Sequence, residues 1–167
     1  MNHKFTLPPG VNLRLAGADD EPFLRELFCS IRTDLALLPL PQAQLEQLIR
    51  QQYDWQQKGY ASQYSGAENW IIENQSVAVG KVTLHRAASR MHIIDFIMTQ
   101  ERRGQGLGGA ILRALQSQVN ADGGILSLRV DRQNLRAKQL YQRLGFIKEQ
   151  STDTHELLVW PSLIQSC

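Results

Sequence analysis

The stretch that decides the fold is IIDFIMTQERRGQGLGG, residues 93–109. Its first six residues are apolar and β-prone except for Asp95, and a short polar connection with two arginines follows them. Four glycines then fall within six residues, at positions 104, 106, 108 and 109. An apolar run, a glycine-rich connection and a helical pattern in this order predict a strand, a tight loop and the N-terminus of a helix.

The helical pattern continues well beyond this stretch. Leu107, Ile111, Leu115 and Val119 recur at every fourth position, and Asp-Gly-Gly at 122–124 ends the pattern. The first N–H groups of a helix have no partner inside the helix, and the helix dipole favours negative charge beside them. Because glycine has no Cβ, a ligand can approach these groups closely, so the pattern predicts a bound anion such as phosphate. A glycine-rich connection that binds no ligand would give the same pattern.

Length and composition indicate one ordinary globular domain. The 167 residues suit a single core, so we treat residues 1–167 as one domain. Hydrophobic residues make up 43% of the sequence and charged residues 20%, as in soluble proteins. No apolar run approaches the ~18 residues of a membrane span, and residues 1–10 lack the apolar centre of a secretory signal. These features predict a cytoplasmic protein with no membrane partner.

Cysteine and histidine are few and scattered. The chain has two cysteines, Cys29 and Cys167, and four histidines. Two cysteines make a disulfide framework improbable, and no cluster of cysteine and histidine has the spacing of metal ligands. We therefore expect no metal.

Charge is unevenly distributed along the chain. Residues 84–150 hold eleven Lys or Arg and five Asp or Glu, a balance of +6, and the remainder holds seven and eleven, a balance of −4, which together give the net +2. This split suits an enzyme that holds a polyanionic cofactor on one side and a cationic acceptor on the other. Solvated surface charge can produce the same split by chance.

Hydrophobic periodicity and turn residues predict the remaining elements. Alternating or continuous apolar residues predict strands at 11–15, 70–73, 77–84, 93–98, 125–130, 146–147 and 157–160. Helical spacing predicts helices from about 20 to 31, from about 45 to Lys58-Gly59, from 107 to 121 and from 134 to 144. A hairpin turn is predicted at 74–76, and the order of elements is β, α, α, β, β, β, α, β, α, β, β.

Aromatic residues gather near the end of the second predicted helix. Tyr53, Trp55, Tyr60 and Tyr64 lie there, beside Asp54. Such residues can line an acceptor pocket, although aromatic residues at helical spacing are more often part of a core. Both interpretations stay open from the sequence.

Two local patterns occur in this order of elements. The motif [Gln/Arg]-x-x-Gly-x-[Gly/Ala] matches RGQGLG at 103–108. A second pattern, Asn followed by Ala, Leu-Tyr and Leu-Gly-Phe, matches Asn134, Ala137, Leu140-Tyr141 and residues 144–146. Together they resemble the GCN5-related N-acetyltransferase (GNAT) superfamily. The resemblance covers about residues 11–160 as a fold and about 91–148 as the motif-bearing core.

The resemblance implies a fold and an activity. The implied fold is α/β (α+β), with a central mixed, mostly antiparallel sheet of about seven strands, flanked by four helices and splayed at the fourth strand. The implied activity moves an acetyl group from acetyl-CoA, a co-substrate, to a primary amine by direct attack in a ternary complex. The helices at about 19–67 would shape the acceptor site. We expect a small-molecule or peptide acceptor, no nucleic acid partner, and a monomer or homodimer.

The resemblance also implies a donor site. The glycine loop would hold the pyrophosphate of acetyl-CoA, and residues 96–98 would pair with the pantetheine arm as an added strand. The N–H of Met98 would point at the thioester carbonyl, where an oriented donor can contribute roughly 2.7 to 4 kcal/mol by stabilising an oxyanion. Asn134 would contact the cofactor arm. The implied cofactor-binding residues are Phe96, Ile97, Met98, Arg103, Gly104, Gln105, Gly106, Leu107, Gly108, Gly109 and Asn134.

Tyr141 is the first implied catalytic residue. It follows Asn134 by seven residues, so both lie on one side of the same helix. Tyr141 would reach the thiolate leaving group as general acid, although it also shares its face with core residues. Reference pKa values of about 10 for tyrosine and about 8.5 for a thiol make this proton transfer uphill by about 2 kcal/mol. Orientation of the sulfur is therefore an alternative role for Tyr141.

His92 is the second implied catalytic residue, as the base that deprotonates the amine. It falls where histone-acetylating relatives carry a glutamate base, and its unperturbed pKa is about 6.5. Asp95 and His85 are further candidates. Strand alternation places His92 and Asp95 on opposite faces unless a bulge lies between them. A water chain with no single base is an alternative in this family.

Three other functions fit parts of the sequence. Gly104, Gly106 and Gly109 also match the dinucleotide-binding spacing G-x-G-x-x-G, which normally follows the first strand of a βαβ array. A non-catalytic module that binds CoA or another phosphate ligand is the main alternative. A nucleic-acid-binding surface lacks the aromatic-plus-basic motif that it would need; its candidate residues are Arg129, Arg132, Arg136 and Arg143.

Overall fold

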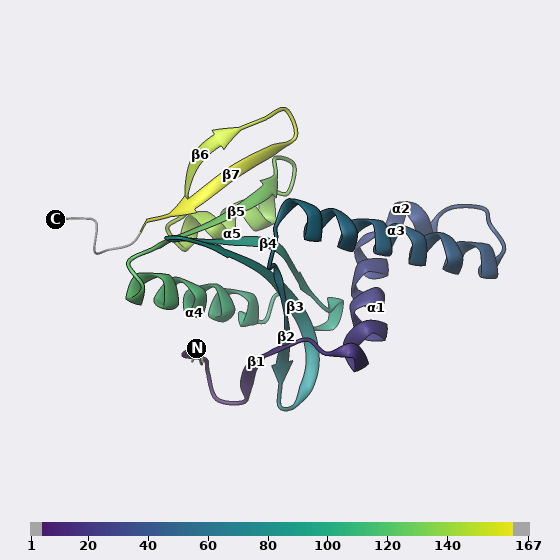
Figure 1. Ribbon diagram of the computed structural model, residues 1–167, viewed down its shortest axis with the longest axis horizontal. Coiled ribbons are helices and arrows are strands. Elements are labelled where there is room, and N and C mark those ends of the chain that lie inside the picture. The colour runs from purple at the N-terminus through teal and green to yellow at the C-terminus, as the bar shows by residue number, and fades with distance from the viewer. Residues whose placement is uncertain (1–4, 162–167) are drawn as a thin grey trace.

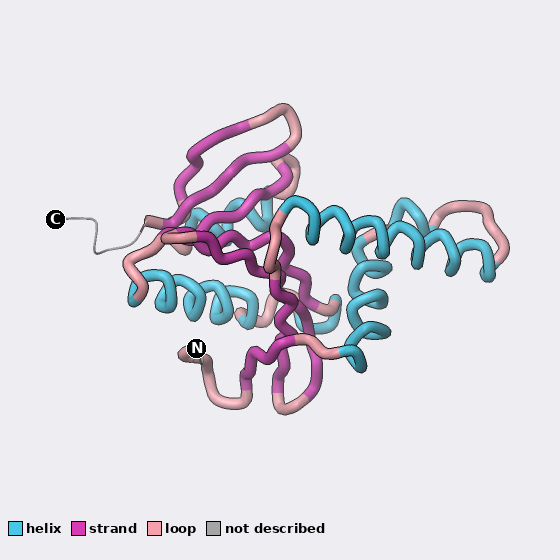
Figure 2. The backbone as a smooth tube through the Cα atoms, viewed as in Figure 1, coloured by secondary structure: helices cyan, strands magenta, loops and turns pink. Residues whose placement is uncertain are grey.

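A seven-stranded sheet lies between two layers of helices in the computed structural model, which describes residues 5–161 (Figures 1 and 2). The strands follow the order β1-β2-β3-β4-β5-β7-β6 across the sheet. Only β4 and β5 pair in parallel, and the other neighbours are antiparallel. The predicted mixed, mostly antiparallel sheet of seven strands is confirmed.

The elements have the following bounds. The strands are β1 (Val11–Leu15), β2 (Glu68–Asn74), β3 (Val77–Ala87), β4 (Arg90–Met98), β5 (Ile125–Asp131), β6 (Ile147–Ser151) and β7 (His155–Trp160). The α-helices are α1 (Glu21–Ile31), α2 (Thr33–Ala36), α3 (Gln42–Gln63), α4 (Leu107–Ala121) and α5 (Leu135–Arg143), with short 3₁₀ turns η1 (Ala18–Asp20) and η2 (Gln100–Arg102). Across residues 5–161, the structure contains no helix with the length and hydropathy to cross a membrane. Cys29 is a free thiol, and Cys167 lies outside the described residues.

The predicted order of elements is confirmed, with two differences. The one-turn helix α2 was not predicted. The helix α3 runs to Gln63, so its predicted end at Lys58-Gly59 is wrong. Tyr60 and Tyr64, on and just after its last turn, pack toward the sheet, and this packing outweighs the roughly 1 kcal/mol that a glycine inside a helix costs.

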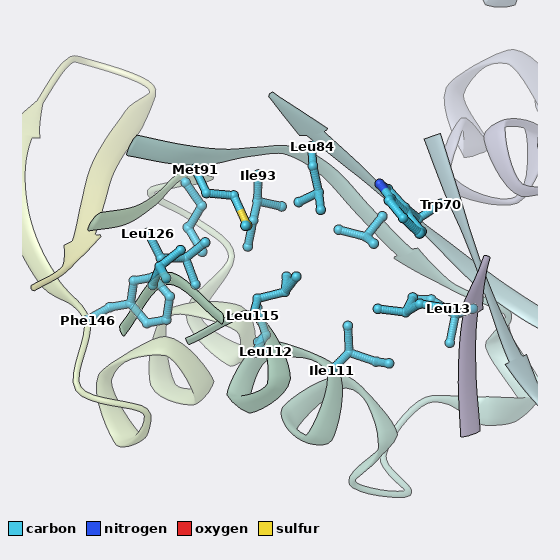
Figure 3. Close-up of a cluster of buried hydrophobic side chains, with 14 of the residues drawn as sticks. Leu13, Trp70, Leu84, Met91, Ile93, Ile111, Leu112, Leu115, Leu126 and Phe146 are labelled. Carbon is cyan, nitrogen blue, oxygen red and sulfur yellow. The ribbon is translucent and has the colours of Figure 1, made fainter. Parts of the chain in front are cut away.

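The sheet has a hydrophobic core on each face. Ile71 and Ile72 are consecutive on β2 and fully buried, yet they point to opposite sides. Ile72 belongs to the larger core, in which Ile111 and Leu115 of α4 pack against the sheet (Figure 3). Ile71 belongs to the smaller core, under α1 and α3. One face of the sheet therefore carries the helix that follows the glycine loop, and the other carries the helices predicted to shape an acceptor site.

Candidate active site

A β-bulge in β4 changes which side chains share a face. Ile93 and Asp95 pair with consecutive residues of β3, so the pairing skips Ile94. An extra residue of this kind reverses the alternation of the strand beyond it. His92 and Asp95 therefore share the face under α1 and α3. Strand alternation placed them on opposite faces unless a bulge lay between them, and the bulge at Ile94 does so.

The strands β4 and β5 pair only over their first halves. Residues 90–93 pair with residues 125–128, and β4 then continues to Met98, where no residue of the described β5 pairs with it. The fourth strand is therefore splayed from the fifth, as predicted. We call the space beside residues 94–98 the β4–β5 gap.

The main chain of β4 directs hydrogen-bonding groups into this gap. The N–H of Thr99 donates to the carbonyl oxygen of Val79 at 2.8 Å, which makes these residues a hydrogen-bonded pair of the β3–β4 ladder. Hydrogen-bonded and non-hydrogen-bonded pairs alternate along an antiparallel ladder. Ile97 therefore bonds toward β3, whereas the N–H groups of Phe96 and Met98 point toward the gap. Of residues 96–98, only Phe96 and Met98 offer main-chain groups to an added strand.

Gly80 allows β3 to approach this part of β4 closely. It pairs with Met98, and a Cβ on Gly80 would lie 2.6 Å from the carbonyl oxygen of Ile97 and 2.9 Å from Sδ of Met98. Any side chain there would push the two strands apart. The position of the Met98 main chain thus depends on a glycine in the neighbouring strand.

The glycine loop presents a row of N–H donors. Gly104 and Gly106 have φ values of +76° and +80°, which favour glycine, and Gly106 is the N-cap of α4. The first main-chain bond of the helix runs from the N–H of Ala110 to the carbonyl oxygen of Gly106 at 3.1 Å. The N–H groups from 104 to 109 donate to no acceptor that residues 5–161 provide. They are therefore free to bind an anion at the positive end of α4.

Side chains hold the loop in place. Arg103 donates from Nε to the carbonyl oxygen of Met98 at 3.1 Å, and Gln105 donates from Nε2 to the carbonyl oxygen of Glu101 at 3.0 Å. The Phe96 ring lies 3.6 Å from where a Cβ of Gly108 would stand. These contacts connect the end of β4 with the first turn of α4, so the loop and the gap form one continuous site.

Two arginines that we had not assigned to the donor site lie against the glycine loop. A guanidinium nitrogen of Arg136, on α5, lies 3.0 Å from where a Cβ of Gly104 would stand. A guanidinium nitrogen of Arg113, on α4, lies 3.4 Å from where a Cβ of Gly109 would stand. Neither they nor Arg103 form an ion pair with any carboxylate among the described residues, so their charge is available to an anion. Arg136 had entered the sequence analysis only as a nucleic-acid candidate.

Asn134 and Tyr141 lie at the start and near the end of α5. Asn134 is the N-cap, and its Oδ1 accepts a hydrogen bond from the N–H of Ala137 at 3.2 Å. Tyr141 is half-buried, with its ring 5.7 Å from that of Phe146 in an edge contact. Burial, and after it the charge of Asp95, raise the pKa of Tyr141 to about 12. Tyr141 packs on the α4 side, whereas Asp95 faces α3, so the two side chains lie on opposite faces of the sheet.

The charge of Asp95 affects residues on both faces of the sheet. Its Oδ2 lies 3.1 Å from Nζ of Lys81 on β3. On the α3 side, burial, and after it the charge of Asp95, raise the pKa of Tyr60 to about 12. Tyr60 and Tyr141 therefore stay neutral on the two sides of one carboxylate, and Lys81 is its cationic partner. We had not assigned Lys81 any role from the sequence, because a lone lysine within an apolar strand carries no motif.

His92 lies beside the paired half of β4 and β5 rather than at the gap. Its Nδ1 is 2.8 Å from Oγ of Ser127, and its ring stacks on Tyr64 with centroids 5.5 Å apart. Burial, and after it the charges of Arg129, Arg90 and His85, lower the pKa of His92 to about 4. His92 is therefore neutral at neutral pH.

The aromatic residues around α3 divide between core and site. Tyr53 is 2% exposed in the smaller core, and Trp55 is 57% exposed to solvent. Tyr60 and Tyr64 face Asp95 and His92, on the proposed acceptor side. Among the described residues, no three His, Cys, Asp or Glu side chains are grouped so that they could hold a metal ion.

The fold and site define a class of protein in which a glycine-rich loop with free N–H groups lies beside an open strand edge, in a sheet with a separate helical layer on each face. The family model for the acetyltransferase (GNAT) family matches residues 32–146. The chain belongs to this family, and it is an acyl-CoA-dependent N-acetyltransferase. A non-catalytic binding module is not favoured. No curated protein sequence matches the chain significantly.

Solved acetyltransferases share the fold at low sequence identity. The PaiA N-acetyltransferase from Thermoplasma acidophilum, in complex with coenzyme A, is 16% identical with a TM-score of 0.68, over 90% of this chain and 98% of that one. The ribosomal-protein-S18-alanine N-acetyltransferase from Escherichia coli is 17% identical with a TM-score of 0.66, over 92% and 95%. A spermidine N-acetyltransferase SpeG mutant from Vibrio cholerae is 16% identical with a TM-score of 0.65, over 95% and 99%.

Proposed function

We propose that this chain transfers the acetyl group of acetyl-CoA to a primary amine by direct attack in a ternary complex. The observation that carries the proposal is the continuity of the glycine loop with the β4–β5 gap. Free N–H groups run from 104 to 109, and those of Phe96 and Met98 follow along the gap. An elongated acyl-donor molecule, with phosphates at one end and amides and a thioester at the other, fits N–H groups arranged in this order.

The residues around the loop and gap fit acetyl-CoA part by part. The free N–H groups would bind phosphate oxygens, and so would the guanidinium groups of Arg103 and Arg136, which form no ion pair among the described residues. The main chain of Phe96 would pair with the pantetheine arm, and the N–H of Met98 would bind the acyl carbonyl oxygen. When bound, acetyl-CoA supplies an acyl group on a thiolate leaving group.

Asn134, Ile97 and Tyr141 have more limited roles in this proposal. The Oδ1 of Asn134 caps α5, so its amide nitrogen is the atom available to the arm. Ile97 bonds toward β3 and shapes the gap without pairing across it. Tyr141, with a pKa of about 12, is uphill by about 5 kcal/mol as a proton donor to a thiolate of pKa about 8.5. Tyr141 would therefore act by donating a hydrogen bond to the sulfur and keeping its own proton.

The acceptor would approach from the α3 side, where Asp95 borders the gap. Its carboxylate would bind the ammonium form of the amine and release the proton toward solvent as the amine attacks. We keep His92 as the proposed base, with a role in proton relay. A pKa of about 4 makes it a weak acceptor from an alkylammonium of pKa about 10. Its role would be to pass the proton on, with His85 directly across the β3–β4 ladder as the next group.

The proposed acceptor is defined by its chemical class, a primary amine. Two proteins that share the fold are a ribosomal-protein-S18-alanine N-acetyltransferase and a spermidine N-acetyltransferase, whose names specify a peptide amine and a small polyamine. We propose a small-molecule or peptide amine for this chain. A cytoplasmic location, the absence of a nucleic acid partner and a monomeric or homodimeric state stay predictions from the sequence.

Thiol release from acetyl-CoA tests the proposal directly. The panel comprises polyamines, aminoglycosides, amino acids, and peptides that present either a free N-terminus or a lysine. We expect turnover with at least one class, and loss of about tenfold or more in kcat/KM on Asp95→Asn. Calorimetric binding of CoA with no thiol release for any amine would instead support the non-catalytic module.

A further inference from the structure

Lys81 is a charged residue in an apolar row of the sheet. In the register of β2, β3 and β4 it lies between Ile71 and Ile97, which are 0% and 6% exposed. Lys81 itself is 2% exposed. An isoleucine or methionine would fill this position without the penalty of taking an ammonium group out of water. Packing alone therefore does not account for the lysine.

The partner of Lys81 is the carboxylate that borders the β4–β5 gap. Nζ of Lys81 lies 3.1 Å from Oδ2 of Asp95, and their side chains are 3% and 16% exposed. The ammonium is thus the buried end of the pair, and the carboxylate is the end that reaches solvent. The pair exists because of the bulge at Ile94, which turns Asp95 to the same face as Lys81. Buried ion pairs seldom stabilise a fold more than apolar residues of the same volume would.

We infer that Lys81 is a positioning residue for the proposed acetyl transfer: it holds the Asp95 carboxylate in one orientation on the acceptor side of the gap. The inference rests on the proposed function, since it assigns the group that prepares the acceptor-binding carboxylate. Lys81 is buried behind Asp95, so it touches neither substrate and moves no proton in the reaction. One carboxylate oxygen is engaged by Lys81, which leaves Oδ1 for the acceptor ammonium.

The groups around Asp95 give Lys81 this role. Thr83 pairs with Asp95 across the ladder, and its hydroxyl donates to Asn69 at 2.7 Å. Tyr60 from α3 and Tyr141 from α5 stay protonated, and His92 on the same face stays neutral at neutral pH. Of these groups, Lys81 alone carries a positive charge there. Without it, none of these groups would hold the carboxylate by charge in one orientation, and the carboxylate would bind the acceptor ammonium less well.

The test compares three single variants with an acceptor found in the thiol-release screen. Lys81→Met removes the charge and keeps the volume, and Lys81→Arg keeps the charge. Lys138→Met is the matched control, because Nζ of Lys138 also lies 3.1 Å from a carboxylate, that of Glu156 on β7. The strand β7 lies on the far side of β5 from β4. For each variant we would measure kcat and the KM for each of the two substrates, CoA affinity by calorimetry, and thermal unfolding.

Lys81→Met should lower kcat/KM by about tenfold or more, and the loss should come from a higher KM for the acceptor, with the KM for acetyl-CoA unchanged. CoA affinity should be unchanged, Lys81→Arg should recover most of the activity, and Lys138→Met should keep the wild-type profile. An unchanged KM for the acceptor, or a loss of activity that Lys81→Arg does not rescue, would show that Lys81 is only structural. A wild-type chain that binds CoA but acetylates no amine would overturn the proposed function instead.

A double variant covers the case in which Lys81→Met does not fold. Replacing both partners, as Lys81→Met with Asp95→Asn, leaves no buried charge unpaired. If Lys81 acts through Asp95, this double variant should have the same kcat/KM as Asp95→Asn alone. A further loss of about tenfold in the double variant would mean that Lys81 acts by another route, and the inference would be wrong.

Discussion

The close approach of β3 and β4 at Gly80 allows a test of the Met98 main chain. In a Gly80→Ala variant, the new Cβ would lie 2.6 Å from the carbonyl oxygen of Ile97, whereas real Cβ contacts stay above 3.0 Å. The strands must therefore separate by 0.4 Å or more, the difference between these two distances. A misplacement of about 1 Å at a reacting centre can cost about a hundredfold in rate. We expect kcat to fall about tenfold or more.

The assay for this variant separates chemistry from donor binding and from stability. Thiol release gives kcat, and calorimetry gives CoA affinity, which should change little because the phosphate-binding N–H groups begin at Gly104. Gly124→Ala is the matched control, since its Cβ would lie 2.7 Å from the carbonyl oxygen of Ser89, at the start of β5 and far from the gap. Gly59→Ala is a second control, because no atom lies within 4 Å of its new Cβ. It should stabilise α3 by about 0.5 to 1 kcal/mol. Wild-type kcat in Gly80→Ala, or an equal loss in Gly124→Ala, would refute the role of Met98.

Three further predictions concern the helices and the acceptor face. Tyr141→Phe should lower kcat about tenfold to a hundredfold, with little change in KM for acetyl-CoA; steady-state kinetics with full activity would contradict this. Between pH 6.5 and about 4 the unfolded chain binds a proton at His92 that the folded chain does not. The free energy of unfolding should therefore decrease as the pH is lowered through this range, by at most about 3 kcal/mol. Urea unfolding of His92→Gln should show a weaker pH dependence, and an equal one would count against it. Arg136→Ala should weaken CoA binding about threefold to tenfold in low salt, and Arg143→Ala, two turns further along α5, should not.

Much of the donor site could be predicted from the sequence, because its parts are local. The strand, the loop and α4 are consecutive, and glycines at positions of positive φ mark the loop directly. The N-cap at Asn134 and the φ of +87° at Gly145 likewise follow from the residue type at each end of α5. The arginines beside the loop could not be assigned, since Arg136 meets Gly104 only after α5 has packed on the sheet.

The acceptor side depended more on packing than on motif. The sequence offered His92 and Asp95 as alternatives on opposite faces, and the two share a face because β3 and β4 pair with a bulge at Ile94. A bulge depends on how two strands fit against each other and against the layers on each side, so strand alternation alone cannot place it. The continuation of α3 past Gly59 has the same origin, since contacts of Tyr60 and Tyr64 with the sheet outweigh a local preference.

The sequence by itself determined the order of elements apart from α2, the glycine loop before α4 and the membership of a family, because periodicity, turn residues and motif spacing are properties of short segments. The tertiary structure decided which groups meet at the β4–β5 gap. Lys81, Asp95, Tyr60 and Tyr141 come from four separate elements, and their contacts depend on strand register and helix packing. Charge and burial act over a few ångströms in space, whatever the separation along the chain, and for that reason only the folded chain shows a lysine buried behind the proposed acceptor-binding carboxylate.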